Sequence, residues 1–404
     1  MNRVRLDALI KSDEAGFACS KTRLVESGLP HLRPFNISSD GRLDFAEVYQ
    51  VPEAAAPSGK TYLEAGDILF NNTNSAELVG KSALVQSAMR AGFSNHLTRI
   101  RLDKNQIEPA FLSFWLKRLR DTGFFTDQAT QWVSQAAYKT SEVRKLEIDL
   151  PPLPEQRRIV DLLSRAEGIV RLRREAEKKA AELIPALFLD IFGDPTTNPK
   201  GWPVATLGEI LCDGPQNGLY KHASHYGDGT PILRIDAFYD GRVTALHALK
   251  RVRVTPDERA KFRLGSRNIV INRVNSPEYL GKSAIIPVLD EEMVFESNMM
   301  RFALDESFAL PEYVIDVLQT AHAKTHFLSK AKHAINQSSI NQQDVKSLRV
   351  PLPPLDRQRA FAAWKADVIS IQSQQSAATA KAQATFGALL ASIFSTNHAT
   401  KTDD

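Results

Sequence analysis

Two lysine-containing turns are the first candidates for chemistry in this sequence of 404 residues. Gly80-Lys81-Ser82 and Gly281-Lys282-Ser283 match the end of a P-loop, in which backbone amides cradle a nucleotide phosphate. A P-loop also needs a glycine five residues before its second glycine, and the sequence has Ser75 and Ser276 there. We therefore expect these turns to support a domain, or to place their lysines on a phosphate group of a ligand, and not to hydrolyse a nucleotide.

The motifs of DNA-modifying enzymes are missing. An amino-methyltransferase needs Asn or Asp, two prolines and an aromatic residue, together with a glycine-rich cofactor loop. The two Pro-Pro pairs, Pro151-Pro152 and Pro353-Pro354, instead lie between leucines. Pro256-Asp257 is the one Pro-Asp pair, and no acidic-x-Lys follows it at the spacing of a metal-dependent nuclease. No catalytic residue is predicted in this chain.

Histidine pairs give the only metal-like spacing. His222 with His225, and His322 with His326, have no third ligand nearby, so we expect surface or helix-capping histidines and no metal site. Cys19 and Cys212 occupy unrelated positions, which favours a reduced cytoplasmic protein. No membrane-length apolar run and no signal-peptide core are expected.

The composition predicts a globular protein of two or more domains, because one hydrophobic core rarely serves 404 residues. The net charge of +4 is compatible with nucleic acid without requiring it.

An internal repeat organises the chain. Pairs of similar segments recur at a nearly constant offset of about two hundred residues through almost the whole sequence. The matching positions are Pro30 and Pro231, Gly41 and Gly241, Asn71 and Asn272, Asn74 and Asn275, Gly80 and Gly281, Ser94-Asn95 and Ser297-Asn298, Arg99 and Arg301, Gln135 and Gln337. Each half is therefore predicted to contain one α/β domain, at residues 1–150 and 200–349.

Alternating apolar residues predict strands at 67–71, 99–102, 269–272 and 300–304. Apolar residues at helical spacing predict helices at 109–119 and 311–318.

A long helix is predicted to follow each domain, within residues 151–199 and 350–404, with a polar tail at 395–404. Each begins after a stiff proline-rich opening, since proline fixes φ and holds the preceding residue extended. Both helices have an apolar seam with alternating spacings of three and four, which predicts an intramolecular antiparallel coiled coil. The first seam consists of Ile159, Leu162, Ala166, Ile169, Arg173, Ala176, Ala180, Leu183 and Leu187, and the second begins at Phe361, Trp364 and Val368. Two unrelated amphipathic helices on separate cores are the alternative.

This plan resembles the specificity (S) subunit family of type I restriction–modification systems over nearly the whole chain. The most specific marks are the repeated Leu-Pro-Pro-Leu-x-x-Gln-Arg openings, Leu150 to Arg157 and Leu352 to Arg359. The second copy departs from the first at Asp356-Arg357, which puts a partner contact there in doubt.

The resemblance implies an α+β fold: two pseudo-symmetric α/β target-recognition domains separated by two long helices packed as an antiparallel coiled coil. It implies a non-catalytic reader of a bipartite, asymmetric site in double-stranded DNA. Its helices would dock two methyltransferase (M) subunits, and restriction (R) subunits would join. S-adenosylmethionine, ATP and Mg²⁺ would belong to those partners. The alternatives are the specificity subunit of a related restriction system, and a two-domain DNA-binding scaffold without methyltransferase partners.

Amide and guanidinium side chains suit base edges, whereas lysine suits phosphates. The DNA-binding candidates in the first domain are Arg33, Asn36, Asn71, Asn72, Asn74, Lys81, Asn95, Arg99 and Lys139. Those in the second are Arg234, Tyr239, Asn272, Arg273, Asn275, Lys282, Asn298 and Lys332. Positions that differ between halves should specify bases: Asn72 against Arg273, Thr73 against Val274, Gln131 against His333. The partner-docking candidates are Gln156, Arg157, Arg158, Gln358 and Arg359.

Overall fold

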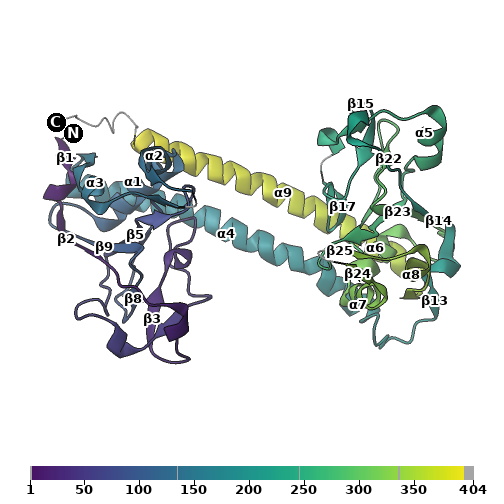
Figure 1. The fold of residues 1–404 in the computed structure, drawn as a ribbon, viewed down its shortest axis with the longest axis horizontal. Coiled ribbons are helices and arrows are strands. Elements are labelled where there is room, and N and C mark those ends of the chain that lie inside the picture. Colours follow the sequence, from purple (N-terminus) through teal and green to yellow (C-terminus); the bar gives the residue numbers. More distant parts are fainter. Residues whose placement is uncertain (1, 134, 245, 335–336, 395–404) are drawn as a thin grey trace. The chain divides into compact units, whose positions relative to one another are not determined.

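The computed structural model describes residues 2–133, 135–244, 246–334 and 337–394. These residues form two compact units, Met1–Glu175 with Ala377–Asp404 and Ala176–Ser376. Because the long helices α4 (Leu153–Phe192) and α9 (Leu355–Ile393) each run through both units, every unit contains part of each helix (Figure 1). The polar tail predicted at 395–404 lies outside the described residues.

The first unit is built on the antiparallel sheet β2-β9-β5-β7. Three smaller sheets, β4-β3-β8, β10-β11-β6 and β1-β12, surround it. Its strands are β1 (Asn2–Arg5), β2 (Ile10–Ala15), β3 (Leu29–Leu32), β4 (Tyr49–Val51), β5 (Ile68–Asn71), β6 (Thr73–Asn74), β7 (Ser82–Leu84), β8 (Gly92–Phe93), β9 (Leu97–Leu102), β10 (Thr130–Gln131), β11 (Ala136–Ala137) and β12 (Glu147–Leu150). Its shorter helices are α1 (Pro109–Asp121), α2 (Phe124–Gln128) and α3 (Thr140–Lys145).

The second unit repeats this plan. Its main sheet β14-β23-β19-β21 has the same order and gains β17-β16 at one edge, and its small sheets β18-β15-β22, β20-β25-β24 and β13-β26 match those of the first unit. Its strands are β13 (Val204–Thr206), β14 (Leu211–Asn217), β15 (Tyr226–Leu233), β16 (Phe238–Tyr239), β17 (Gly241–Val243), β18 (Arg251–Val252), β19 (Ile269–Asn272), β20 (Val274–Asn275), β21 (Ser283–Ile285), β22 (Val294–Phe295), β23 (Met299–Leu304), β24 (Lys332–Ala334), β25 (Gln337–Ser339) and β26 (Arg349–Pro351). Its shorter helices are α5 (Pro256–Phe262), α6 (Pro311–Gln319), α7 (Ala321–Lys330) and α8 (Gln342–Lys346). The predicted internal repeat is thus a repeat of topology.

The central strand of each unit is buried on both faces. In β5, Ile68 and Phe70 join the core beneath α1 and the long helices, whereas Leu69 faces the core of the small sheet. In β19, Ile269 and Ile271 face α6 and Val270 faces the other way. Strands buried on both sides have continuous apolar runs, so the predicted strands are present but without the alternation from which they were predicted.

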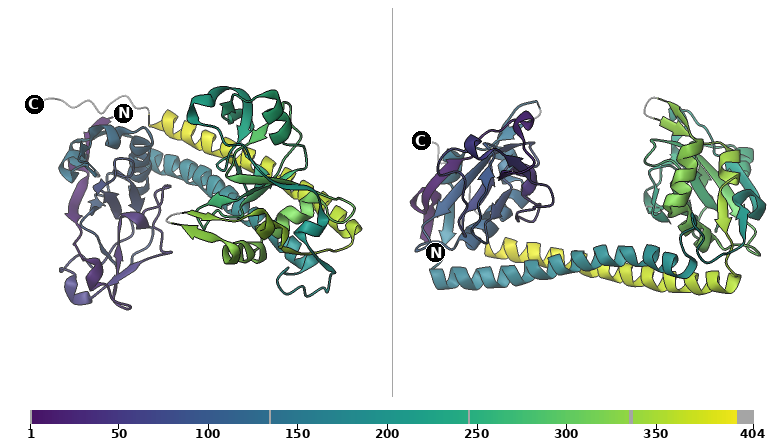
Figure 2. Two further views of the ribbon diagram at one scale, coloured as in Figure 1. Left: turned by 45° about the vertical axis from the view of Figure 1, so that its right-hand side comes forward. Right: turned by 90° about the horizontal axis from the view of Figure 1, so that it is seen from below.

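The two long helices pack on each other in opposite directions, as predicted (Figures 1 and 2). In the first unit, the beginning of α4 shares a core with the end of α9 through Leu163, Val170 and Phe386. In the second unit, the end of α4 meets the beginning of α9, where Phe192 lies 5.2 Å from Phe361 between ring centroids. The two contacts together define an antiparallel pair.

The buried seam differs from the predicted one by a residue at several steps. Ile159 and Ala180 are buried as predicted, but Leu163 and Val170 are buried where Leu162 and Ile169 were expected. Both residues of such neighbouring pairs are apolar, so the sequence pattern fits either register. The apolar residues left out of the seam are exposed on the helices.

Candidate nucleic-acid interface

The repeated asparagines after β5 and β19 lie inside their turns. Asn71 and Asn272 are fully buried and donate their amides to Leu78 O at 3.0 Å and Tyr279 O at 3.4 Å. Their backbones close the same turns, because the N–H of Asn71 donates to Lys81 O at 2.7 Å and that of Asn272 to Lys282 O at 2.8 Å. Both asparagines therefore shape the turn and do not present their amides to a ligand.

The two turn lysines are half-buried, and burial lowers the pKa of both ammonium groups. Arg120 lowers the pKa of Lys81 further. Lys282 donates to Ile235 O at 2.6 Å, and its Nζ lies 3.9 Å from the ring centroid of Tyr239. The ammonium of Lys282 thus packs against its own domain, and the exposed rings of Tyr239 and Tyr279 lie beside it.

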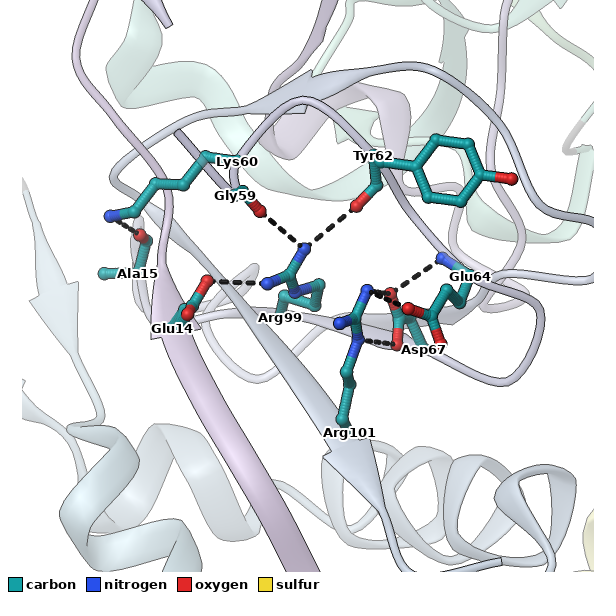
Figure 3. Close-up of polar contacts among 9 residues, drawn as sticks. All are labelled: Glu14, Ala15, Gly59, Lys60, Tyr62, Glu64, Asp67, Arg99 and Arg101. Atoms are coloured by element: carbon teal, nitrogen blue, oxygen red, sulfur yellow. Dashed lines mark hydrogen bonds and ion pairs between the residues drawn. The ribbon is translucent and has the colours of Figure 1, made fainter. Parts of the chain in front are cut away.

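Arg99 is the centre of a polar network in the first unit (Figure 3). Its buried guanidinium donates to Gly59 O at 3.2 Å, to Tyr62 O at 2.9 Å and to Glu14 Oε2 at 2.6 Å. Beside it, Arg101 donates to Asp67 Oδ1 at 2.8 Å. These arginines tie the loop before β5 to the main sheet, so Arg99 is engaged inside its domain.

Arg33 and Asn36 are likewise engaged in the first unit. Arg33 donates to Cys19 O at 2.9 Å, and its guanidinium carbon lies 4.7 Å from the Tyr49 ring centroid. The Asn36 amide is buried and donates to the carbonyls of Asp44 and Glu47 at 2.9 and 2.7 Å. Asn36 therefore holds its own loop in place.

The short strands β6 and β20 carry the next candidates. Asn74 and Asn275 are half-buried, and each accepts from the following residue's N–H at 2.8 Å. Asn72 donates to Thr98 Oγ1 at 3.1 Å, whereas Arg273 donates to Ser297 O at 3.1 Å. The pair that differs between the halves thus has different surroundings as well.

Four further candidates are at least partly open to solvent. Asn95, Lys139 and Lys332 are exposed and Asn298 is half-buried. The backbone of Asn72 donates to His96 O, and that of Arg273 to Asn298 O. His96 is therefore the counterpart of Asn298, which corrects the sequence match of Asn95 with Asn298 by one residue. Gln131 is exposed, and the side chain of its counterpart His333 lies outside the described structure.

A cleft of about 360 Å³ surrounds Arg234 in the second unit. Glu296 lies at its base, largely buried, with Oε1 accepting from Ile235 N at 2.7 Å and with Oε2 3.7 Å from Arg234 Nε. Burial raises the pKa of the Glu296 carboxyl above its usual value. Tyr220 is well exposed at the rim, where an aromatic ring can stack on a base. Neither Tyr220 nor Glu296 was a sequence candidate, because neither has a matching residue in the other half.

The glutamine of each proline-rich opening is a buried clamp. The Oε1 of Gln156 accepts from Glu108 N at 2.8 Å, and its Nε2 donates to Gln106 O at 3.1 Å and Pro151 O at 2.8 Å. Gln358 makes the same three bonds, to Leu310 N at 2.8 Å, Phe308 O at 3.3 Å and Pro353 O at 2.8 Å. Since Glu108 and Leu310 are the N-cap residues of α1 and α6, each glutamine fastens a domain helix to the start of a long helix. This role was missed, because a glutamine beside two arginines has the composition of a surface.

The arginines of the same openings face solvent. The side chain of Arg157 is 66% exposed and that of Arg158 68%, and Arg359 is exposed. Apolar side chains are exposed further along the helices: Leu162, Ile169 and Leu172 on α4 in the first unit, and Leu183 on α4 with Trp364 and Ile371 on α9 in the second. Such rows of exposed apolar residues are typical of protein–protein contacts.

The histidine pair on α7 contacts the backbone of its own domain. His322 Nε2 lies 2.8 Å from Arg349 O and His326 Nε2 lies 2.9 Å from Asp344 O. Within the described residues, no group of three His, Cys, Asp or Glu side chains could hold a metal ion. No helix in the described part of the chain has the length and apolarity needed to span a bilayer.

Comparison with known proteins gives consistent matches. The family model for the type I restriction modification DNA specificity domain matches residues 36–182 and again 199–373. The putative type I restriction enzyme MjaX specificity subunit of Methanocaldococcus jannaschii is 27% identical over 80% of this chain and 76% of that protein. The StySPI specificity subunit of Salmonella potsdam is 23% identical over 83% of this chain and 74% of that protein.

Solved structures have the same fold. One chain belongs to a structure described as the basis of complex assembly and conformational transition of the type I R-M system. It aligns with a TM-score of 0.61 and 21% identity over 97% of both chains. The S subunit of the type I system of M. genitalium aligns with a TM-score of 0.53 and 13% identity, over 97% of this chain and 96% of that one.

Proposed function

Because the chain belongs to the type I restriction–modification specificity subunit family, with two target-recognition domains, we propose that it reads a bipartite DNA site with one domain on each part. One observation carries this proposal: the two domains share the same scaffold, but they have different polar side chains at equivalent positions. The sheets and the glutamine clamps are duplicated, whereas Asn72 and Arg273 differ at equivalent positions. Such a chain suits a site whose two halves differ in sequence.

The side chains open to solvent would make the DNA contacts. Arginine forks onto guanine and amides bind adenine, whereas lysine neutralises phosphates. Arg273, Asn298 and the cleft around Arg234 are the candidates that the geometry supports in the second domain. In the first domain, Asn95 and Lys139 are exposed. The buried Asn36, Asn71, Asn272 and Arg99 would support the contacts from behind.

Methyltransferase and restriction subunits are the proposed partners, docked on the long helices. The exposed arginines of the openings and the exposed apolar residues of the helices support this proposal. S-adenosylmethionine, ATP and Mg²⁺ would be bound by those partners. The purified chain alone should therefore turn over neither S-adenosylmethionine nor ATP, and turnover by the isolated chain would contradict the proposal.

The decisive experiment is methylation sequencing of DNA from cells that express this chain with its partner subunits. The wild type should methylate adenines within one bipartite sequence. Replacing residues 1–150 with the equivalent domain of a relative should change one half of that sequence and leave the other unchanged. A change in both halves would show that the domains do not read independently.

Partner docking is tested by placing charge on the helices. Trp364→Glu or Ile371→Glu should weaken co-purification of methyltransferase subunits while leaving the fold unchanged, because both side chains are about half exposed. Ser370→Glu, at an exposed position of the same helix, is the matched control. Arg157→Glu with Arg158→Glu tests the openings in the same way. Undiminished assembly in all of these variants would place the partner surface elsewhere.

A further inference from the structure

A second cleft of the second unit, of about 380 Å³, is lined by polar side chains alone. Its lining consists of Asn217, Arg273, Asn341, Gln342, Gln343 and Lys346. Two of these residues are cationic and none is acidic. Within the described residues, neither Arg273 nor Lys346 makes an ion pair with a carboxylate, although both side chains are half-buried. The cleft therefore carries positive charge that the domain itself leaves unneutralised.

The equivalent place in the first unit is neutralised. Arg99 opposes Glu14 in the sheet as Arg301 opposes Gln216, and Arg101 opposes Ser12 as Ala303 opposes Asp213. Asp13 therefore corresponds to the irregular pair Gly214-Pro215, where β14 has one extra residue. Arg144 of α3 occupies the position of Lys346 on α8, and it donates from Nε to Asp13 Oδ1 at 2.9 Å. Lys346 lacks such a carboxylate, because neither Gly214 nor Pro215 carries one.

The second cation of the cleft is Arg273. At its position the first unit has Asn72, which belongs to a chain of side-chain hydrogen bonds. In the first unit Asn72 donates to Thr98 Oγ1, and that hydroxyl lies 3.0 Å from Thr140 Oγ1. The second unit has Arg273, Met300 and Gln342 at these three positions, so the hydroxyl chain is absent. Arg273 Nη1 donates to Ser297 O at 3.1 Å, which holds the guanidinium at the cleft.

We propose that this cleft binds one phosphate of the DNA backbone, and that the second domain thereby contributes a phosphate contact that the first domain lacks at the equivalent position. The inference rests on the proposed DNA-reading function and deepens it. A guanine edge requires a single arginine fork. A second unpaired cation in the same cleft is instead what an anion requires, and the neutral amides around it supply further donors. Arg273 is therefore assigned to the backbone, although its difference from Asn72 predicted a base contact.

The test measures the salt dependence of DNA binding by the full chain together with its co-purifying subunits. Affinities for 40-base-pair duplexes of several unrelated sequences are measured over a series of KCl concentrations. The double variant Arg273→Gln/Lys346→Gln should lower the slope of log K against log salt by about 0.9, the value for one phosphate contact. It should weaken binding by a similar factor for every sequence.

Asn217→Asp is a second variant, for the case that the double variant fails to fold. It keeps both cations and places a carboxylate where they can pair with it, so the charge of the cleft is neutralised. This variant should lower the slope by a similar amount without lowering the melting temperature. Arg144→Gln, at the neutralised position of the first unit, is the matched control and should leave the slope unchanged.

The outcomes separate the site from the function. Wild-type binding with an unchanged slope in the variants overturns the phosphate site alone. A changed base preference at one position with an unchanged slope assigns Arg273 to a base edge and also overturns the site. A wild-type assembly that binds no duplex overturns the proposed DNA-reading function, and the site with it.

Discussion

The two domains hold their long helices through one shared contact and one contact that differs. Gln156 and Gln358 make the same three hydrogen bonds in both units. About two turns further along the helices, the second unit has an ion pair in which Lys365 Nζ lies 2.6 Å from Asp316 Oδ2. The first unit has Leu163 and Phe114 at these positions, both buried in its core. The hydrogen-bonded clamp is thus common to both attachments, whereas either an apolar or an ionic pair can complete them.

Breaking the ion pair of the second unit should have the largest effect on stability. Both side chains of the Asp316–Lys365 pair are largely buried, and burial raises the pKa of the Asp316 carboxyl although Lys365 opposes this. Asp316→Ala leaves a buried ammonium without its partner, which costs about 3 kcal/mol of unfolding free energy. Urea unfolding followed by circular dichroism measures the loss.

The double variant Asp316→Phe/Lys365→Leu sharpens the comparison, because it gives the second unit the pair found in the first. Apolar replacement of a buried ion pair is often neutral, so the double variant should lie within about 1 kcal/mol of the wild type. If Asp316→Ala alone were as stable as the wild type, the pair would have no structural role.

The shared clamp should have a somewhat smaller effect, equal in the two units. Gln156→Ala removes three hydrogen bonds and leaves the N–H of Glu108 without its partner at the start of α1. We expect a loss of about 2 kcal/mol, and the same loss for Gln358→Ala. Arg157→Ala changes an exposed neighbour and should stay within about 0.5 kcal/mol of the wild type. If the two glutamine variants lost very different amounts of unfolding free energy, the same hydrogen bonds would contribute differently to the stability of the two units.

The fold was predictable from the sequence to the extent that it depends on repetition and apolar runs. The offset of about two hundred residues predicted two similar domains. The apolar residues around Ile68 and Ile269 predicted their central strands, although these residues form continuous runs and not the expected alternation. The seam register was wrong at Leu162 and Ile169, because an apolar neighbour follows each of them. In such a helix, packing against a particular partner decides the register, and a single sequence does not contain that information.

The candidate site was less predictable, since the type of a polar residue does not reveal its burial. Asn36 and Asn71 have the composition of DNA-contacting residues, yet both are buried and hydrogen-bonded to backbone carbonyls. Lys346 was not predicted as a DNA-binding residue, because its unpaired charge depends on the absence of a carboxylate from the neighbouring strand β14. A comparison of Asp13 with Gly214-Pro215 in the other half could have indicated it, but only after the sheet register was known.

The smallest predicted effect concerns pH and a buried histidine present in one domain only. His31 lies on β3, and its equivalent on β15 is Ile232. The His31 ring is buried, with Nε2 3.1 Å from Phe17 O, and among the described residues no side-chain or backbone group is within hydrogen-bonding geometry of Nδ1. Burial lowers the pKa of His31 below 6.5, and the nearby Arg33 lowers it further, although the Phe17 carbonyl opposes the shift. The imidazole is therefore neutral in the folded domain at neutral pH.

The sign of the pH dependence follows from this lowered pKa. As the pH falls below 6.5, the histidine binds a proton in the unfolded chain but not in the folded one, so acid stabilises the unfolded state. Stability should be fully present above pH 6.5 and should decline below it, until the folded-state pKa is reached. From pH 7.5 to 5.5 the His31 contribution should therefore fall, by no more than roughly 1.4 kcal/mol for each pH unit. His31→Ile, which installs the residue of the second domain, should remove this decline, as should His31→Gln. Urea unfolding at both pH values measures the difference, and equal declines in the wild type and both variants would show that His31 does not cause it.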